Sequence, residues 1–311
     1  MTDWLGDTLI ATTILMALVL LIREPVRSHF GPAVAYGLWL IPAARLLMPT
    51  LTTTVERTLP AVAPPVIGLP LNAVSLASTP AAAIPPPGLF EQLGGWSGLA
   101  LIAWSVGALA MLGHGIATYR RQRRAVLSNS VQLARLDNSR LIRSGAVGGP
   151  MAFGIFDRVI VLPIDFDECY DAGQRRLALE HELAHHRSGD LIANHVAYVL
   201  LCLQWFNPLA WAAHAAFRFD QEAACDARVL DKVSGPDRAA YGQAIAKAAS
   251  GRALLFSGAL DRPSTLQRRL RSMLSSPNPA RRSVGKSLIA VTAALALPLT
   301  ATWATQYVDI A

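Results

Sequence analysis

Charged residues are scarce in this sequence, at 16% of 311 residues, whereas hydrophobic residues make up 52%. Soluble domains carry about 25% charged residues, so much of this chain is expected to face lipid rather than water. A net charge of +7 would suit nucleic acid, but no basic face with a matching motif accompanies it. The composition therefore predicts a membrane protein without direct nucleic-acid binding.

Cysteine is scarce too, and its three copies, Cys169, Cys202 and Cys225, lack the close spacing of a metal knuckle. This odd number excludes a confident disulfide framework and suits a reducing compartment. The N-terminus lacks the basic lead and the small-residue cleavage pattern of a signal peptide. We therefore expect the first apolar run to remain in the mature protein as a helix.

Lys and Arg are nearly absent from both ends of the chain, since 24 of the 28 fall between Arg120 and Lys286, four precede that stretch and none follows it. A membrane-spanning helix needs about 20 predominantly apolar residues. Four segments meet or approach that length: 4–22, 31–48, 96–116 and 287–307. We therefore expect a mainly α membrane protein with four transmembrane helices.

These spans divide the chain into five parts: two transmembrane helices in 1–48, a Pro/Ala-rich loop in 49–95, a third helix in 96–116, an α+β domain in 117–286, and a fourth helix with a short tail in 287–311. Basic residues flank the spans on the side of the α+β domain, which predicts that this domain is cytoplasmic, at a bacterial inner membrane. Both termini and the Pro/Ala-rich loop are then extracytoplasmic. The loop is typical of an extended linker, and a role in sensing or partner contact stays open. Asp7 and Arg45 are expected to reach the membrane interface by snorkelling.

The cytoplasmic domain combines short strands with helices. Apolar runs at 131–136, 141–147 and 159–162 predict a small antiparallel sheet, and the last run, as an edge strand, could hold a substrate backbone. Helical periodicity follows in 173–188 and 208–233. The apolar run 191–206 is too short for a confident fifth span, so it is either a core helix or one that dips into the bilayer surface.

A His-Glu-x-x-His motif, His181-Glu182-Leu183-Ala184-His185, lies in the first of these helices. Residues four apart share a helix face, so His181 and His185 can bind one metal ion. Zinc is the ion that this pattern indicates, and Glu182 can accept a proton from the water that zinc activates and return it to the leaving amine. The motif therefore predicts a zinc metallopeptidase with Glu182 as the catalytic residue.

A catalytic zinc site takes three protein ligands and keeps one position open. Glu222 is the best candidate for the third ligand, because it lies on a downstream helix with Asp226 one turn further on. Asp226 can accept the free N–H of a ligating histidine and so fix its tautomer. Cys225 is a less favoured ligand, and a solvated helix face is the alternative role for both carboxylates.

Other polar residues leave more than one interpretation. A donor that stabilises the oxyanion is expected, and Tyr241, His195 and Arg228 are equal candidates for it. His186 points about 100° away from His185 on a helix, so we expect it to be a surface or packing residue. The basic amphipathic stretch around 266–274 suits an anionic membrane surface.

Further segments extend the pattern through most of the chain. They are Leu38-Trp39-Leu40 with Arg45-Leu46-Leu47-Met48-Pro49, Phe153-Gly154, Val159-Ile160-Val161-Leu162-Pro163, Gly189-Asp190, Phe206-Asn207-Pro208-Leu209-Ala210-Trp211 and Ala224-Cys225-Asp226. Together with the His motif and Glu222, they make the chain resemble the membrane metallopeptidase domain of the BlaR/MecR antirepressor family. Arg158 stands where that family usually has Pro, which is a minor departure.

The resemblance implies a gluzincin-type site in which His181, His185 and Glu222 bind zinc, Glu182 is the acid–base residue and Asp226 supports a ligand. It also implies signal-responsive cleavage of a cytoplasmic protein, typically a transcriptional repressor, or of the protease itself. β-Lactam sensors of the family carry a penicillin-binding domain after the last helix, whereas only a few residues follow it here. We therefore do not expect β-lactam sensing by this chain, and a homo-oligomer or a separate sensor partner stays open.

Two other functions fit the sequence. A membrane quality-control protease of the HtpX type shares the ligand pattern but cleaves many damaged membrane proteins. A non-catalytic membrane receptor or scaffold would keep zinc for structure alone. Cleavage of many unrelated membrane proteins would favour the quality-control protease over a regulatory peptidase. An unchanged phenotype after Glu182→Ala would favour the non-catalytic receptor or scaffold.

Overall fold

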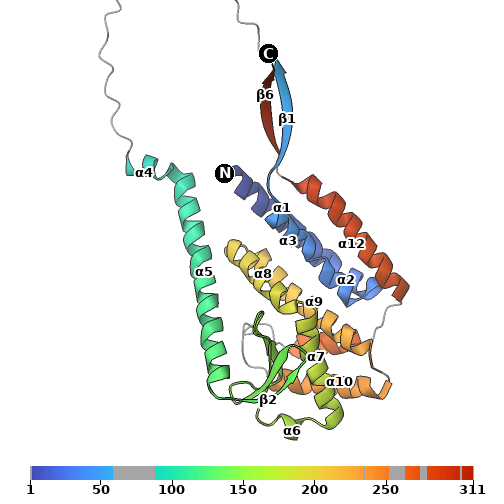
Figure 1. The fold of residues 1–311 in the computed structure, drawn as a ribbon. Coiled ribbons are helices and arrows are strands. Elements are labelled where there is room, and N and C mark those ends of the chain that lie inside the picture. The colour runs from blue at the N-terminus through green and yellow to red at the C-terminus, as the bar shows by residue number, and fades with distance from the viewer. Residues whose placement is uncertain are drawn as a thin grey trace, which may run out of the picture.

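The computed structural model describes residues 2–58, 88–233, 235–251, 263–273, 279–301 and 303–310. The protein is mostly helical, with a small mixed sheet. Three helices of the described residues are long and apolar enough to cross a membrane: α1 (Thr2–Phe30), α5 (Gly95–Ser128) and α12 (Pro279–Thr300). They coincide with the first, third and fourth predicted spans, although the fourth begins and ends earlier than expected (Figure 1).

The second predicted span is not confirmed as a single helix. It forms two short helices, α2 (Pro32–Gly37) and α3 (Leu40–Leu47), which meet at Leu38 and Trp39. Pro42 explains the interruption, because it has no N–H to donate to the carbonyl of Leu38 and is tolerated only in the first turn of a new helix. The structure therefore does not confirm the predicted count of four spans.

The ends of the chain lie together, away from the four-stranded sheet. Strand β1 (Leu51–Thr58) pairs in parallel with β6 (Trp303–Ile310), beyond the ends of α3 and α12. Figure 1 shows this ribbon and the N-terminus at one end of the molecule, and α7 and the sheet at the other. Most of the predicted linker at 49–95 lies outside the described residues, except for β1 and the stretch from residue 88 onward, which includes α4 (Leu89–Gln92).

The sheet is mixed, which corrects the prediction of an antiparallel one. It contains β2 (Ser130–Leu136), β3 (Ser139–Ser144), β4 (Met151–Phe153) and β5 (Val159–Leu162), in the order β2-β3-β5-β4. The β3–β5 pair is parallel and the other two pairs are antiparallel. The prediction of β5 as an edge strand was wrong, because β4 pairs with its outer side. Strand β4 has only three residues after a Gly-Gly-Pro turn, which is too short to recognise in the sequence.

Six helices lie between the sheet and α12 in the described part of the chain. They are α6 (Phe166–Cys169), α7 (Ala172–Arg187), α8 (Asp190–Leu203), α9 (Pro208–Leu230), α10 (Gly235–Gly251) and α11 (Pro263–Met273). Helix α7 begins with a capping box, in which the Asp171 carboxylate accepts the backbone N–H of Gln174 at 2.9 Å. Helix α9 begins at Pro208, with the Asn207 side chain as its N-cap.

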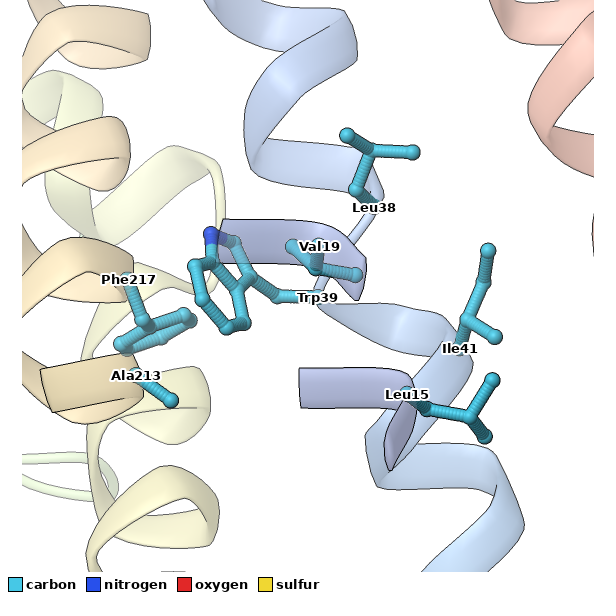
Figure 2. Packing of buried hydrophobic residues seen from close by; sticks show 7 residues of the cluster. All are labelled: Leu15, Val19, Leu38, Trp39, Ile41, Ala213 and Phe217. Carbon is cyan, nitrogen blue, oxygen red and sulfur yellow. The ribbon is translucent and has the colours of Figure 1, made fainter. Parts of the chain in front are cut away.

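One apolar cluster joins the membrane helices to α9. Its buried members are Leu15, Val19, Leu38, Trp39, Ile41, Ala213 and Phe217. Figure 2 shows the indole of Trp39 pointing from the α2–α3 segment toward Phe217 and Ala213 of α9. Burial of such side chains stabilises a fold by roughly 1.5–3 kcal/mol each. This packing therefore fixes α9 against the membrane helices.

A buried ion-pair network reinforces the same junction. The Asp220 side chain is fully buried on α9 and accepts Arg23 Nη1 of α1 at 2.7 Å and Trp39 Nε1 at 2.9 Å. Arg27 Nη1 lies 3.5 Å from the other oxygen of Asp220. One carboxylate thus pairs with two arginines and ties α1 to α9.

Replacing Asp220 with Ala is expected to destabilise the protein by about 3–5 kcal/mol, because it removes the buried counter-charge of Arg23 and Arg27 and leaves them only the half-exposed Glu24. The loss would appear as a lower unfolding temperature of the detergent-purified protein. The matched control is Asp231→Ala, which removes a half-exposed partner of Arg282 and is expected to cost less than about 1 kcal/mol. Equal unfolding temperatures for the two variants would contradict the network's structural role.

Arg45 corrects another prediction, because it does not snorkel to the interface. Its side chain is 1% exposed, with Nε donating to the Thr300 carbonyl at 2.7 Å and Nη1 to Thr8 Oγ1 at 3.3 Å. The charge stays buried since α1 and the end of α12 supply these acceptors. Arg45 therefore links three membrane-side helices.

Candidate metal centre

Two buried imidazoles face each other on α7. His181 and His185 are one turn apart, are 1% and 8% exposed, and place their Nε2 atoms 3.2 Å apart. Helical spacing brings the two rings to one face, as the sequence predicts. The position between the two nitrogens is the centre of the candidate site.

Each imidazole has a partner on its Nδ1 atom that sets its tautomer. His185 Nδ1 lies 2.9 Å from Asp190 Oδ2, and a carboxylate only accepts, so this nitrogen carries the proton. His181 Nδ1 lies 2.8 Å from the Tyr241 oxygen, whose hydroxyl donates to Asp226 Oδ1 at 2.8 Å, so Nδ1 of His181 donates as well. Both Nε2 atoms are left with a lone pair pointing into the site.

Glu222 of α9 lies beside these two nitrogens. Its Oε2 is 3.5 Å from His181 Nε2, and its Oε1 is 3.8 Å from His185 Nε2. Glu222 Oε2 is buried and has no hydrogen-bond partner among the described residues. The structure thus brings together the three residues that the sequence suggests as ligands.

The geometry of these three residues fits a divalent cation. A tetrahedral ion with bonds of about 2.0–2.1 Å holds two nitrogen ligands about 3.3–3.4 Å apart, close to the observed 3.2 Å between the Nε2 atoms. Two nitrogen lone pairs at that distance cannot hydrogen-bond each other and repel without a cation or proton between them. The Glu222 carboxylate completes a donor set of two nitrogens and one oxygen.

Arg269 of α11 and Asp226 lie behind Glu222. Arg269 donates Nε to Asp226 Oδ2 at 2.9 Å and Nη2 to Asp226 Oδ1 at 2.8 Å, and its Nη2 lies 3.2 Å from Glu222 Oε2. Burial by itself would raise the pKa of Glu222, but the Arg269 guanidinium beside it holds that pKa well below its usual value. Glu222 is therefore ionised, as a metal ligand must be.

Asp226 reaches His181 mainly through Tyr241. The direct distance from Asp226 Oδ1 to His181 Nδ1 is 3.5 Å, longer than a good hydrogen bond, whereas the Tyr241 hydroxyl lies 2.8 Å from each. Burial and the Asp226 charge raise the pKa of Tyr241 well above its usual value, so its hydroxyl stays protonated. Tyr241 was a candidate oxyanion donor, but these contacts place it between Asp226 and a histidine.

The other two oxyanion candidates are also engaged elsewhere. Arg228 Nη1 donates to Asp190 Oδ2 at 3.0 Å, behind His185. His195 places Nδ1 2.7 Å from the Leu191 carbonyl on its own helix and is exposed. His186 turns away from the centre, with Nε2 3.2 Å from the Val159 carbonyl, as its helical angle predicts.

Cys225 also borders the centre. Its thiol, with the nitrogens of His181 and His185, forms a group of ligand atoms within 4.8 Å of one another. The thiol is fully buried, and its Sγ lies 3.5 Å from the His181 carbonyl, to which it can donate. Glu222 and Cys225 are therefore the two candidates for the third ligand.

Sequence reasoning missed Asp190 and Arg269. Asp190 is 1% exposed at the start of α8 and accepts His185, Arg228 and, at 3.3 Å, the Tyr36 hydroxyl. Burial alone would raise the pKa of Asp190, but His185 and Arg228 lower it. Its motif, Gly189-Asp190, was visible in the sequence, but only the turn between α7 and α8 directs the carboxylate back to His185.

Glu182 occupies the position between the two histidines on α7. Its side chain is 3% exposed. Of the predicted site residues, His181, His185 and Glu222 therefore gather around one point, Asp226 lies behind them, and Glu182 directly follows His181 on α7.

Known proteins align with parts of this chain. The regulatory protein BlaR1 of Bacillus licheniformis is 32% identical over 107 residues, which are 34% of this chain and 18% of that protein. The methicillin resistance mecR1 protein of Staphylococcus aureus is 29% identical over 163 residues, which are 47% of this chain and 28% of that protein, and the Staphylococcus epidermidis protein matches equally. The alignments thus cover less than a third of the relatives' own length.

A family model matches far more of the chain, from residue 4 to residue 273. This range includes α1, the sheet, both histidines of α7, the carboxylates of α9 and Arg269 of α11. Peptidases of this family are metallopeptidases, which agrees with a cation between the imidazoles. The chain belongs to the BlaR1 peptidase M56 family of membrane regulatory peptidases.

Proposed function

We propose that this protein is a zinc-dependent endopeptidase whose metal is bound by His181, His185 and Glu222. The proposal rests on two imidazole lone pairs 3.2 Å apart, beside a buried Glu222 oxygen without a hydrogen-bond partner. Two nitrogens and one carboxylate are the ligand set of a catalytic zinc site with an open fourth position. Zinc at such a site supplies Lewis-acid chemistry, since it acidifies water and polarises the scissile carbonyl.

Glu182 is the general base and acid in this proposal. It accepts a proton from the attacking water and returns that proton to the nitrogen of the leaving amine. Asp190 holds His185 with Nδ1 protonated, and Tyr241 with Asp226 does the same for His181. Arg269 keeps Glu222 and Asp226 in their ionised, acceptor-only form.

Strand β4 is the proposed holder of the substrate backbone. It is an edge of the four-stranded sheet and lies against α7, which carries the histidines. An extended peptide can add to such an edge by main-chain hydrogen bonds. This assigns to β4 the role that the sequence had suggested for β5.

The proposed substrate is a cytoplasmic regulator of the repressor type, or the protease itself. The aligned relatives are named as a regulatory protein and a methicillin resistance protein, which supports a role in regulation. The proposed setting is a bacterial inner membrane with both termini outside and the metal centre on the cytoplasmic side, because basic residues flank the spans there. Cleavage of many unrelated membrane proteins would instead favour quality control.

Metal analysis of the detergent-purified protein tests the proposal. The wild type is expected to hold one zinc ion per chain, and His185→Ala is expected to lose it because two protein ligands remain. Inductively coupled plasma mass spectrometry measures the ratio. His214→Ala, which removes a histidine of α9 outside the centre, is expected to retain its zinc. A wild-type protein that holds no stoichiometric zinc would contradict the proposal of a zinc-dependent peptidase.

Asp190→Asn is expected to weaken Zn²⁺ binding by about 10–100-fold, because it removes the charged acceptor that orients His185. Competition with a zinc-binding dye measures the dissociation constant. Asp237→Asn, which alters an exposed pair with Arg176 on the other side of α7, is the control and should bind as the wild type does. Unchanged affinity in Asp190→Asn would show that the carboxylate does not support the site.

A further inference from the structure

The hairpin formed by α8 and α9 contains a long stretch without charge. No Asp, Glu, Lys or Arg occurs from residue 191 to residue 217, a run of 27 residues. A membrane-spanning helix needs only about 20 such residues. Here the run turns back on itself at Gln204–Asn207, between the end of α8 and the start of α9.

Polar side chains at the tip of this hairpin bind α1. Gln204 Nε2 donates to Thr12 Oγ1 at 2.7 Å, and Asn207 Nδ2 donates to Thr13 Oγ1 at 2.8 Å. Gln204 and Asn207 are 2% and 8% exposed. These bonds set the depth of the tip, because they connect it to known positions on a membrane-spanning helix.

That depth is near the middle of the bilayer. Thr13 precedes Arg23, the first basic residue of α1, by ten residues, which is about 15 Å along a helix. The hydrocarbon core is about 30 Å thick. A second contact agrees, because Trp104 Nε1 of α5 donates to the Leu203 carbonyl at 2.8 Å and Trp104 lies about 18 Å before the end of its predicted span at Ile116.

The outer side of the hairpin is apolar and uncovered. Ile192, Val196 and Val199 are 51%, 41% and 42% exposed at positions four and three apart, so they form one face of α8. The tip adds four large exposed side chains: Trp205, Phe206, Leu209 and Trp211. A contiguous apolar surface of this size is costly in water.

Several backbone N–H groups of the turn have acceptors within the protein. Gln204 N–H donates to the Leu201 carbonyl, Asn207 N–H to the Gln204 carbonyl, and Leu209 N–H to the Asn207 side chain. Non-helical backbone is tolerated at membrane depth only when its polar groups have such partners. These bonds lower the cost of placing the turn in hydrocarbon.

We propose that the α8–α9 hairpin is inserted in the bilayer as a re-entrant element, with lipid acyl chains against its exposed apolar face and its tip near mid-depth. The 14 residues of α8 measure about 21 Å, so Asp190 lies about 6 Å outside the hydrocarbon when the tip is 15 Å deep. The metal centre is then at the level of the lipid headgroups. A polypeptide must come to the membrane surface to reach it.

Spin labels on α8 test the insertion. The full chain, with exposed Cys169 replaced by Ser, carries one nitroxide at Ile192→Cys, Val196→Cys or Val199→Cys in vesicles of phosphatidylethanolamine and phosphatidylglycerol. Relaxation by apolar oxygen is compared with relaxation by a water-soluble nickel chelate. We expect oxygen to dominate at Val199, with a label depth about 10 Å greater than at Ile192.

Two positions calibrate the measurement. Val106→Cys, on the exposed face of α5, is the lipid reference, and Arg135→Cys, exposed on β2, is the water reference. A Val199 label that behaves like the Arg135 label, or equal depths at all three α8 positions, overturns the inference. The readout needs neither zinc nor cleavage, so it is independent of the proposed peptidase activity.

Discussion

Replacing Glu182 with Gln is expected to reduce peptide-bond cleavage by about 10²–10⁴-fold while the protein keeps its zinc. Gln has nearly the same shape as Glu but cannot accept and return the proton of the attacking water. Glu182 is not one of the proposed ligands His181, His185 and Glu222, so the metal should be unaffected. Rates would be measured with quenched fluorescent peptides chosen for cleavage by the wild type, alongside zinc content.

The matched control is Glu180→Gln, two residues earlier on the same helix. Glu180 pairs with Arg187 and Lys232 at the surface, so this variant should cleave at the wild-type rate. Wild-type activity in Glu182→Gln would remove Glu182 from the mechanism. Loss of zinc in that variant would instead make Glu182 part of the metal's binding site.

The residues that share one helix are the part of the centre that the sequence predicts well. Four-residue spacing places His181 with His185 on α7, and Glu222 with Asp226 on α9, without knowledge of the fold. The distance between α7 and α9 could only be guessed, because it depends on the α8–α9 hairpin. The observed 3.5 Å between His181 Nε2 and Glu222 Oε2 agrees with that guess.

Residues that act across a turn or from a distant helix were not predicted. Asp190 begins α8 just after Gly189, whose φ of 71° is a left-handed conformation that reverses the chain direction and brings the carboxylate to His185. Arg269 belongs to a basic amphipathic stretch that we had assigned to the membrane surface. It is 7% exposed and bonded to Asp226, because an unpaired buried carboxylate attracts an arginine more strongly than headgroups do.

The predicted membrane helices also show that local sequence patterns do not determine every element. Composition and length predict three spans correctly as helices, yet a single Pro42 divides the second. The α8 segment was ambiguous in the sequence, since its apolar run fits a core helix as well as a membrane one. The contacts of its hairpin with Thr12, Thr13 and Trp104 are long-range, and the proposed depth rests on them.

Replacing Glu222 with Ala is expected to weaken Zn²⁺ binding by about 10²-fold or more, whereas Cys225→Ser should bind zinc nearly as the wild type does. A protein zinc site gains roughly 10–16 kcal/mol from its ligands, so the loss of one ligand costs several kcal/mol. Dye competition measures both dissociation constants. Cys225→Ser is the matched control, because Cys225 lies one helical turn from Glu222 and its thiol borders the same imidazoles.

Cobalt substitution distinguishes the two ligands directly. A thiolate bound to Co²⁺ gives an intense near-ultraviolet charge-transfer band, and a carboxylate does not. We expect no such band in the Co²⁺-loaded wild type, because the Glu222 oxygens lie 3.5 and 3.8 Å from the imidazole nitrogens, near the spacing of a shared ion. A band that disappears in Cys225→Ser, together with zinc retained in Glu222→Ala, would make Cys225 the third ligand. Glu222 would then be a charged neighbour held by Arg269, and the open position of the metal would face a different side of the centre.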